Sequence, residues 1–138
     1  GGWILVKGSL FVFCHEWSPA ERKLAFVATR ESTGVLETLG AFHWFSKFAS
    51  FCSGLRTELW LDHKSAVQAL ARWWSPTPAM RSVLQDIRLL CVDNFLILHP
   101  CHVLGFPFNS IADHLSHNRV AEAVCLAKVQ FGADATIV

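Results

Sequence analysis

The stretch Leu59-Trp60-Leu61-Asp62-His63-Lys64-Ser65-Ala66-Val67 joins a strand pattern directly to a helix pattern. Leu59 and Leu61 point to one face of the strand and the residues between them to the other. A helix is predicted from Ser65 to Trp74. Ligand-binding side chains of α/β proteins collect just beyond such strand ends, which makes Asp62 a candidate ligand. The alternative is that Asp62 caps the helix that follows.

Similar patterns on both sides predict the other elements of an α/β fold. Strands are predicted at Trp3–Val6, Leu10–Phe13, Glu58–Asp62 and Phe95–Leu104, helices at Val35–Phe51, Ala79–Val92 and Asn109–Ala127, and a final β segment at Val129–Val138. Strands that alternate with helices indicate a mixed sheet flanked by helices. The 138 residues suffice for one hydrophobic core, so a single domain over residues 1–138 is expected.

The composition restricts the partners and the compartment. Hydrophobic residues make up 52% and charged residues 17% of the chain, against about 45–50% and about 25% in ordinary globular domains. The apolar excess predicts surface that a neighbouring domain covers. The net charge of +1 counts against a general nucleic-acid binder. Scattered cysteines without a Cys-x-x-Cys pair indicate a reducing, intracellular compartment (cytoplasm or nucleus), and no apolar run approaches the roughly 20 residues of a membrane helix.

Glu37 is an acid on an otherwise apolar helix face. At about 100° per residue it shares that face with Ala41, Trp44 and Phe48. A carboxylate that points toward a core must be neutralised, hydrogen-bonded or bound to a metal. The alternative is an acid that only complements the positive end of the helix dipole.

A third acid, Asp113, falls in the first turn of the last predicted helix. Taken alone, it is explained as a capping-box acid that answers Ser110. Taken with Glu37 and Asp62, it could complete a group of acids at one sheet edge. Clustered carboxylates raise one another's pKa unless cations neutralise them, and hard oxygen ligands suit Mg²⁺ or Mn²⁺.

These acids lie in four motifs that follow one another along the chain. The motifs are Val35-Leu36-Glu37-Thr38-Leu39-Gly40-Ala41, Leu59-Trp60-Leu61-Asp62-His63-Lys64-Ser65-Ala66-Val67, His102-Val103-Leu104-Gly105 and Asn109-Ser110-Ile111-Ala112-Asp113-His114-Leu115-Ser116. In this order they resemble the ribonuclease H domains of retroelement reverse transcriptases of the DIRS (tyrosine-recombinase) type. Asp62-His63-Lys64 is also similar to gypsy-type elements.

The resemblance implies a ribonuclease H-like fold, with a mixed five-stranded sheet flanked by helices. It also implies an endonuclease that hydrolyses the RNA strand of RNA–DNA hybrids beside a reverse transcriptase domain. The alternative is a catalytically inactive ribonuclease H-like scaffold or nucleic-acid-positioning domain. A different nuclease or integrase of the same superfold stays open, because a fold does not determine a substrate.

In this family, four acids bind two Mg²⁺ or Mn²⁺ ions. By resemblance, Glu37 and Asp62 would hold the second ion and Asp113 the first. The fourth acid bridges both ions from an Asp-Ala-Ser motif on the first, central strand, which in the family precedes the position of Gly1.

Asp134-Ala135-Thr136 near the C-terminus is similar to that Asp-Ala-Ser motif. The chain is therefore predicted to be circularly permuted, with Val129–Asp134 as the central strand and Asp134 as the fourth catalytic ligand. That strand would pair with the strands at Trp3–Val6 and Glu58–Leu61. The alternative is that Lys128–Val138 is an unrelated tail.

Several residues are candidate contacts to the hybrid. Lys64 and Arg72 are placed to contact phosphates, and Asn109 is a further candidate for substrate binding. The pair Trp73-Trp74 ends a predicted helix and either stacks on bases or packs in the core. The loop Phe106-Pro107-Phe108 lacks the mobile histidine of many cellular ribonucleases H, so proton transfer would need another route.

Overall fold

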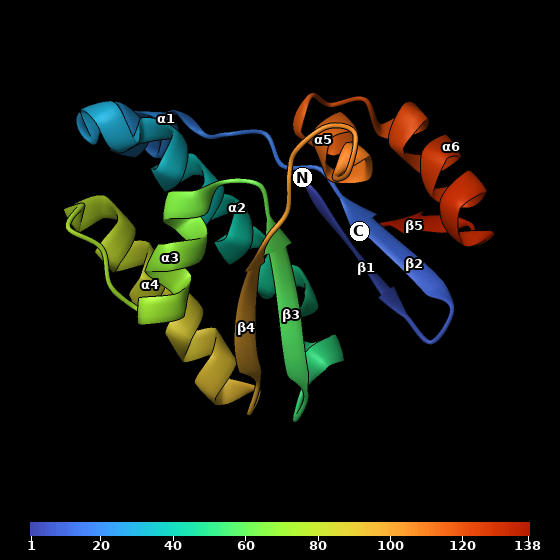
Figure 1. Ribbon diagram of the computed structural model, residues 1–138, viewed down its shortest axis with the longest axis horizontal. Helices are drawn as coiled ribbons and strands as arrows, with labels where there is room; N and C mark the ends of the chain where they lie inside the picture. Colours follow the sequence, from blue (N-terminus) through green and yellow to red (C-terminus); the bar gives the residue numbers. More distant parts are fainter. The chain divides into compact units, whose positions relative to one another are not determined.

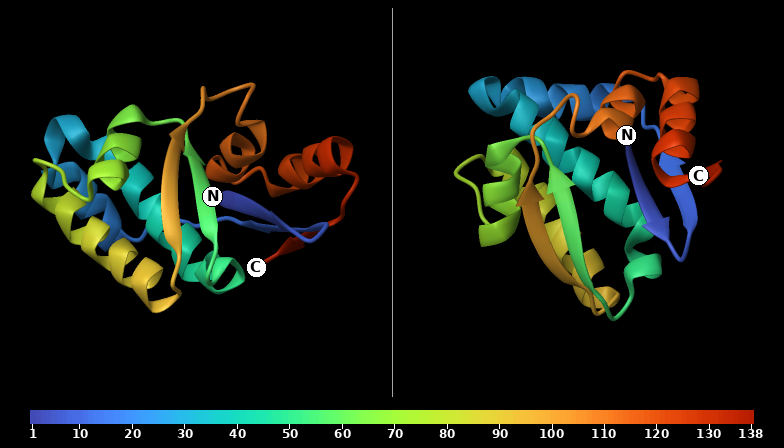
Figure 2. Two further views of the ribbon diagram at one scale, coloured as in Figure 1. Left: turned by 60° about the horizontal axis from the view of Figure 1, so that its bottom comes forward. Right: turned by 45° about the vertical axis from the view of Figure 1, so that its right-hand side comes forward.

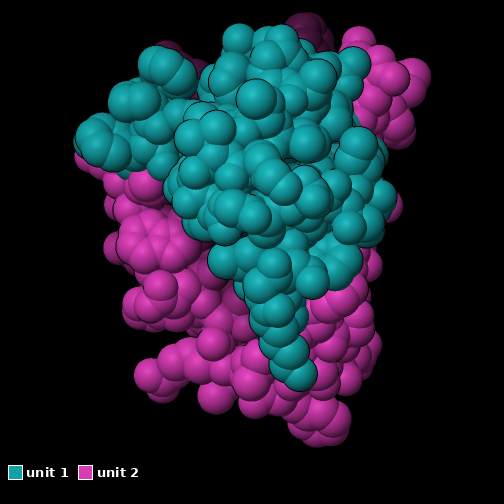
Figure 3. Space-filling model, turned by 90° about the vertical axis from the view of Figure 1, so that its right-hand side faces the viewer, with its two compact units in different colours: residues 1–15, 104–138 teal, residues 16–103 magenta.

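The computed structural model describes all residues from 1 to 138, which form two compact units. Unit 1 combines Gly1–His15 with Leu104–Val138, and unit 2 is the continuous segment Glu16–Val103 (Figure 3). Each unit has strands and helices of its own, so the predicted α/β class is confirmed. The expectation of a single domain stays a prediction.

Unit 1 is a three-stranded sheet with two helices (Figure 1). Its elements are β1 (Gly2–Val6), β2 (Ser9–Phe13), α5 (Ser110–Ser116), α6 (Val120–Phe131) and β5 (Ala135–Ile137). The β1–β2 hairpin turns through Lys7 and Gly8, whose φ angles are 48° and 80°. The core of the unit consists of Leu10, Val12, Ile111, Leu115, Ala123 and Ala127. Residues from both ends of the chain therefore share one core.

Unit 2 is a pair of parallel strands with four helices. Its elements are α1 (Pro19–Val27), α2 (Ser32–Phe48), β3 (Arg56–Leu61), α3 (Lys64–Arg72), α4 (Pro78–Asp93) and β4 (Ile97–His102), with short 3₁₀ turns at Thr29–Glu31 and Ala49–Cys52. The α2 helix packs on α4, and α3 packs on β4 (Figure 1). Buried side chains of the unit include Val35, Phe45, Phe48, Leu70, Met80, Leu84 and Ile87.

Local sequence signals explain several helix ends in unit 2. The α1 helix starts at a capping box, in which Ser18 and Glu21 each bind the other's backbone N–H. The α4 helix starts at Pro78, a residue whose fixed φ suits the first helical position. The α3 helix ends at Trp73, which adopts the left-handed conformation with a φ of 53°.

The predicted five-stranded sheet is wrong. The structure contains a three-stranded sheet in the order β1-β2-β5 and a separate two-stranded sheet of β3 and β4. Hydrophobic alternation identifies a strand and its buried face, but it leaves the partner of that strand open. Four predicted strands correspond to β1, β2, β3 and β4, but their assembly into one sheet around the C-terminal segment was wrong.

The predicted circular permutation is also wrong, because the C-terminus does not form a central strand. Residues through Phe131 continue α6, which ends at Gly132 with a φ of 66°. Only Ala135–Ile137 is a strand, and it pairs in parallel with β2 at the sheet edge. The left view of Figure 2 shows this short strand as the red arrow that ends at the C-terminus. Asp134 precedes this edge strand, so nothing in the fold of unit 1 makes it the bridging acid.

Candidate functional site

Two of the predicted acids, Glu37 and Asp62, interact within unit 2. Glu37 lies in α2, and Asp62 follows the last residue of β3. Burial, and to a lesser extent the negative charge of Asp62, raises the pKa of Glu37 from its ordinary value of 4.5 to about 7. The two carboxylates are therefore close enough for one to oppose the ionisation of the other.

A close packing contact brings the β3–α3 turn to the beginning of α2. The Ser65 hydroxyl lies 3.2 Å from Oε2 of Glu31 and 3.0 Å from Nδ1 of His63. A Cβ atom at Gly34 would lie 2.9 Å from both that Glu31 oxygen and the Ser65 hydroxyl oxygen. Gly34 is therefore the residue that permits this approach, one helical turn before Glu37.

Sequence reasoning identified the two acids and missed this polar contact. Glu31, Gly34, His63 and Ser65 bring the strand end and the helix start together, and none of them was a candidate. The predicted helix began at Val35, so Gly34 stood outside it and gave no signal. The structure buries Gly34 in the first turn of α2, and a glycine within a helix usually has a packing reason.

The donor set of Glu37 and Asp62 fits a hard divalent cation. Both side chains offer carboxylate oxygens, the ligands that Mg²⁺ and Mn²⁺ prefer. A cation between them would remove the repulsion that raises the pKa of Glu37. Two acids supply part of a single site, so a pair of ions would require further ligands from elsewhere.

Asp113 lies in α5 of unit 1 and is engaged by basic neighbours. Its Oδ2 is 3.3 Å from the Arg119 guanidinium, and its Oδ1 is 3.6 Å from Nδ1 of His117. The capping-box alternative does not apply, because the Ser110 hydroxyl donates to the carbonyl of Pro107 and α5 has no side-chain cap. Asp113 is thus neutralised within its own unit.

Asp134 is also paired, and it is almost fully exposed. Its Oδ1 accepts a hydrogen bond from the Lys128 ammonium at 2.6 Å, and the Asp134 side chain is 92% exposed. An exposed ion pair of this kind contributes about 0–1 kcal/mol to stability. Within unit 1, neither Asp113 nor Asp134 joins a group of three metal-ligand side chains.

The candidate substrate-binding residues occupy three helix ends. Lys64 is the first residue of α3 and Arg72 the last, and both side chains are exposed. Asn109 is the N-cap residue of α5 in unit 1, without a capping hydrogen bond from its side chain. The α3 helix therefore carries a cation at each end.

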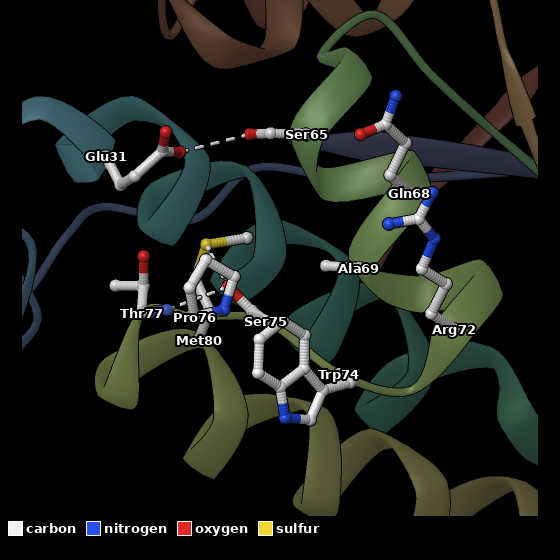
Figure 4. A pocket seen from close by; sticks show the side chains of 10 residues that line it. All are labelled: Glu31, Ser65, Gln68, Ala69, Arg72, Trp74, Ser75, Pro76, Thr77 and Met80. Atoms are coloured by element: carbon white, nitrogen blue, oxygen red, sulfur yellow. Dashed lines mark hydrogen bonds between the residues drawn. The ribbon is translucent and has the colours of Figure 1, made fainter.

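Unit 2 also contains a hollow of about 350 Å³ (Figure 4). It is lined by Ser65, Gln68, Ala69 and Arg72 of α3, by the turn 74–77 between α3 and α4, and by Glu31 and Met80. Arg72 and Trp74 are the two candidate contact residues from the sequence among them. The Glu31–Ser65 hydrogen bond lies at one end of this hollow (Figure 4).

Comparisons with protein-family models, with curated proteins and with solved structures found no match. No helix in the structure combines the length and the apolar character needed to cross a membrane.

Proposed function

We propose that the chain is a metal-dependent endonuclease that hydrolyses the RNA strand of RNA–DNA hybrids, next to a reverse transcriptase domain. The observation that carries this proposal is the approach of Glu37 and Asp62 in unit 2. These acids belong to the two motifs that most resemble retroelement ribonucleases H. A partly buried helix acid beside the charge of a strand-end acid is unfavourable to maintain without a function for the pair.

Glu37 and Asp62 would hold a Mg²⁺ or Mn²⁺ ion. When bound in this kind of site, such ions activate water and stabilise the leaving oxygen. Glu37 has to lose its proton to act as a ligand, and its raised pKa opposes that loss below about pH 7. Metal binding and activity should therefore increase as the pH rises toward 8.

The α3 helix, which starts two residues after Asp62, would hold the substrate backbone. Lys64 and Arg72 are separated by eight residues of helix, which corresponds to about 12 Å along the axis. Two cations at this spacing can contact separate phosphates of one strand. Selection of RNA would require contacts to the 2′-hydroxyl groups in the minor groove.

The second candidate is an inactive ribonuclease H-like scaffold. Two observations favour it: Asp113 is engaged by Arg119, and Asp134 by Lys128. A net charge of +1 also gives little general attraction for a nucleic acid.

Cleavage of a labelled RNA–DNA hybrid tests the choice between the two. The assay uses the chain 1–138, and any longer polypeptide that contains it, with Mg²⁺ or Mn²⁺ and with duplex DNA as a control substrate. We expect ion-dependent cleavage of the hybrid alone, with Asp62→Asn and Glu37→Gln both inactive. Glu58→Gln is the matched control, because Glu58 is an exposed acid of β3 that faces away from the buried Leu59. Folded protein without cleavage in either ion would favour the scaffold.

A further inference from the structure

One wall of the hollow in unit 2 is a stripe of α3 that carries three polar side chains and one alanine. Ser65, Gln68, Ala69 and Arg72 occupy positions i, i+3, i+4 and i+7 of α3, which share one helix face. The residues Trp74 to Thr77 form part of the facing wall. At about 350 Å³ the hollow reaches the lower end of the range of small-molecule sites, about 300–1,000 Å³.

The wall formed by the α3–α4 turn is held in place by its own hydrogen bonds. The buried Ser75 accepts a hydrogen bond from the Thr77 backbone N–H at 3.1 Å. One Arg81 nitrogen donates to the carbonyls of Ser75 and Pro76, at 3.0 and 3.1 Å. The ring of Pro76 restricts the backbone further. The hollow is therefore formed before any ligand arrives, and binding need not order this turn.

The polar groups that face the hollow are largely unused by the protein. The side chains of Gln68 and Arg72 make no hydrogen bond or ion pair within the chain, and Trp74 is 55% exposed. Glu31 accepts a single hydrogen bond, from Ser65. Figure 4 shows an aromatic ring, a guanidinium, an amide and a carboxylate around the same space. These are four different recognition groups with free capacity.

We propose that this hollow binds a single nucleotide, with its base against Trp74 and its phosphate at Arg72. An indole offers a stacking surface to any base, and a guanidinium binds phosphate oxygens in pairs. The edge of the base then faces Gln68, which both donates and accepts, and Glu31, which only accepts. A carboxylate selects a base edge with adjacent N–H donors, so guanine is preferred. This site shares Arg72 with the proposed hybrid contacts, but it needs neither Glu37 nor Asp62 nor a metal ion.

Calorimetric titration with the four nucleoside monophosphates, in EDTA, tests the site without any metal ion. We expect the guanine nucleotide to bind most tightly, and inorganic phosphate to bind much more weakly than any nucleotide. Trp74→Ala should weaken binding about tenfold, the equivalent of about 1.4 kcal/mol of lost stacking. Trp60→Ala is the matched control, because Trp60 of β3 is 54% exposed and lies outside the hollow. Arg72→Ala should act like Trp74→Ala, and Arg88→Ala on α4 should not.

Two further variants complete the experiment. Glu31→Gln should abolish the preference for guanine. Asp62→Asn should bind the nucleotide as the wild type does, because Asp62 belongs to the proposed nuclease site and not to this hollow. A short single-stranded RNA with one guanine shows whether the ligand is a free nucleotide or an unpaired base of a strand. If this RNA binds more tightly than the free nucleotide and loses that affinity in Trp74→Ala, the ligand is an unpaired base of a strand. If it binds more weakly, the ligand is a free nucleotide. No binding of any nucleotide, undiminished binding in Trp74→Ala and Arg72→Ala, or equal affinity for all four bases would overturn the proposal.

Discussion

Replacing Glu37 by glutamine should remove a pH-dependent loss of stability. Burial, and then the charge of Asp62, raises the pKa of Glu37 from 4.5 to about 7. The folded protein therefore binds this proton more tightly than the unfolded chain. The resulting stabilisation is complete below pH 4.5 and is lost as the pH rises toward 7. At roughly 1.4 kcal/mol per pKa unit, the difference between these pKa values corresponds to about 3 kcal/mol.

Urea unfolding, followed by tryptophan fluorescence between about pH 4.5 and about pH 8, measures this loss. Relative to Glu37→Gln, the wild type should lose about 3 kcal/mol of unfolding free energy across that range. At the upper end, Mg²⁺ or Mn²⁺ should restore part of the loss in the wild type and none in Glu37→Gln. Glu58→Gln should follow the wild type throughout. Parallel pH curves for wild type and Glu37→Gln would refute the partial burial of Glu37 beside the charge of Asp62.

Three further outcomes follow from contacts elsewhere in the chain. The losses of unfolding free energy caused by Gly34→Ala and Ser65→Ala should not add up in the double variant, because a Cβ at Gly34 displaces the same Ser65 hydroxyl that the second variant removes. A double variant whose loss equals the sum of the two single losses would contradict this contact. Ser18→Ala should lower the unfolding free energy by about 1 kcal/mol through loss of the α1 cap, measured by urea unfolding. Burial raises the pKa of the Cys91 thiol to about 11. Iodoacetamide in mildly alkaline buffer should therefore modify the exposed Cys125 well before Cys91, which mass spectrometry of peptides measures.

Local patterns predicted most elements of this chain and little of their pairing. The predicted strand at Trp3–Val6 corresponds to β1, and the predicted strand at Glu58–Asp62 corresponds to β3 shifted by one or two residues. Alternation over a few residues is a local property, and so is a helical period. The partner of a strand depends on contacts across the whole sequence, which a single chain does not reveal.

Two errors at the C-terminal end have specific causes. The segment Asn109–Ala127 was predicted as one helix, but Asn118 takes a φ of 57° and separates α5 from α6 without a glycine or proline to signal it. The apolar run that starts at Val129 was predicted as a strand. It continues α6 instead, because Ala123 and Ala127 bury one helix face and Phe131 extends the same spacing.

The candidate site could be predicted only where one side chain stood out from its own element. Glu37 interrupts an apolar helix face and Asp62 ends a strand, so both were visible in the sequence. The contact of Glu31 with Ser65 joins residues 34 positions apart, and neither residue is unusual in its own segment. The polar stripe of α3 became a candidate binding surface only when the turn at Ser75 was placed opposite it.

The pairing of β2 with β5 affects how the chain can fold during synthesis. Leu10 pairs with Ala135 and Val12 with Ile137, so the first hairpin emerges from the ribosome long before its third strand. Unit 2 is continuous and can condense while the chain is still being translated. The hairpin has to wait with Leu10 and Val12 uncovered until α5 and α6 have been made. During that interval unit 1 is the segment most exposed to chaperones and to misassociation.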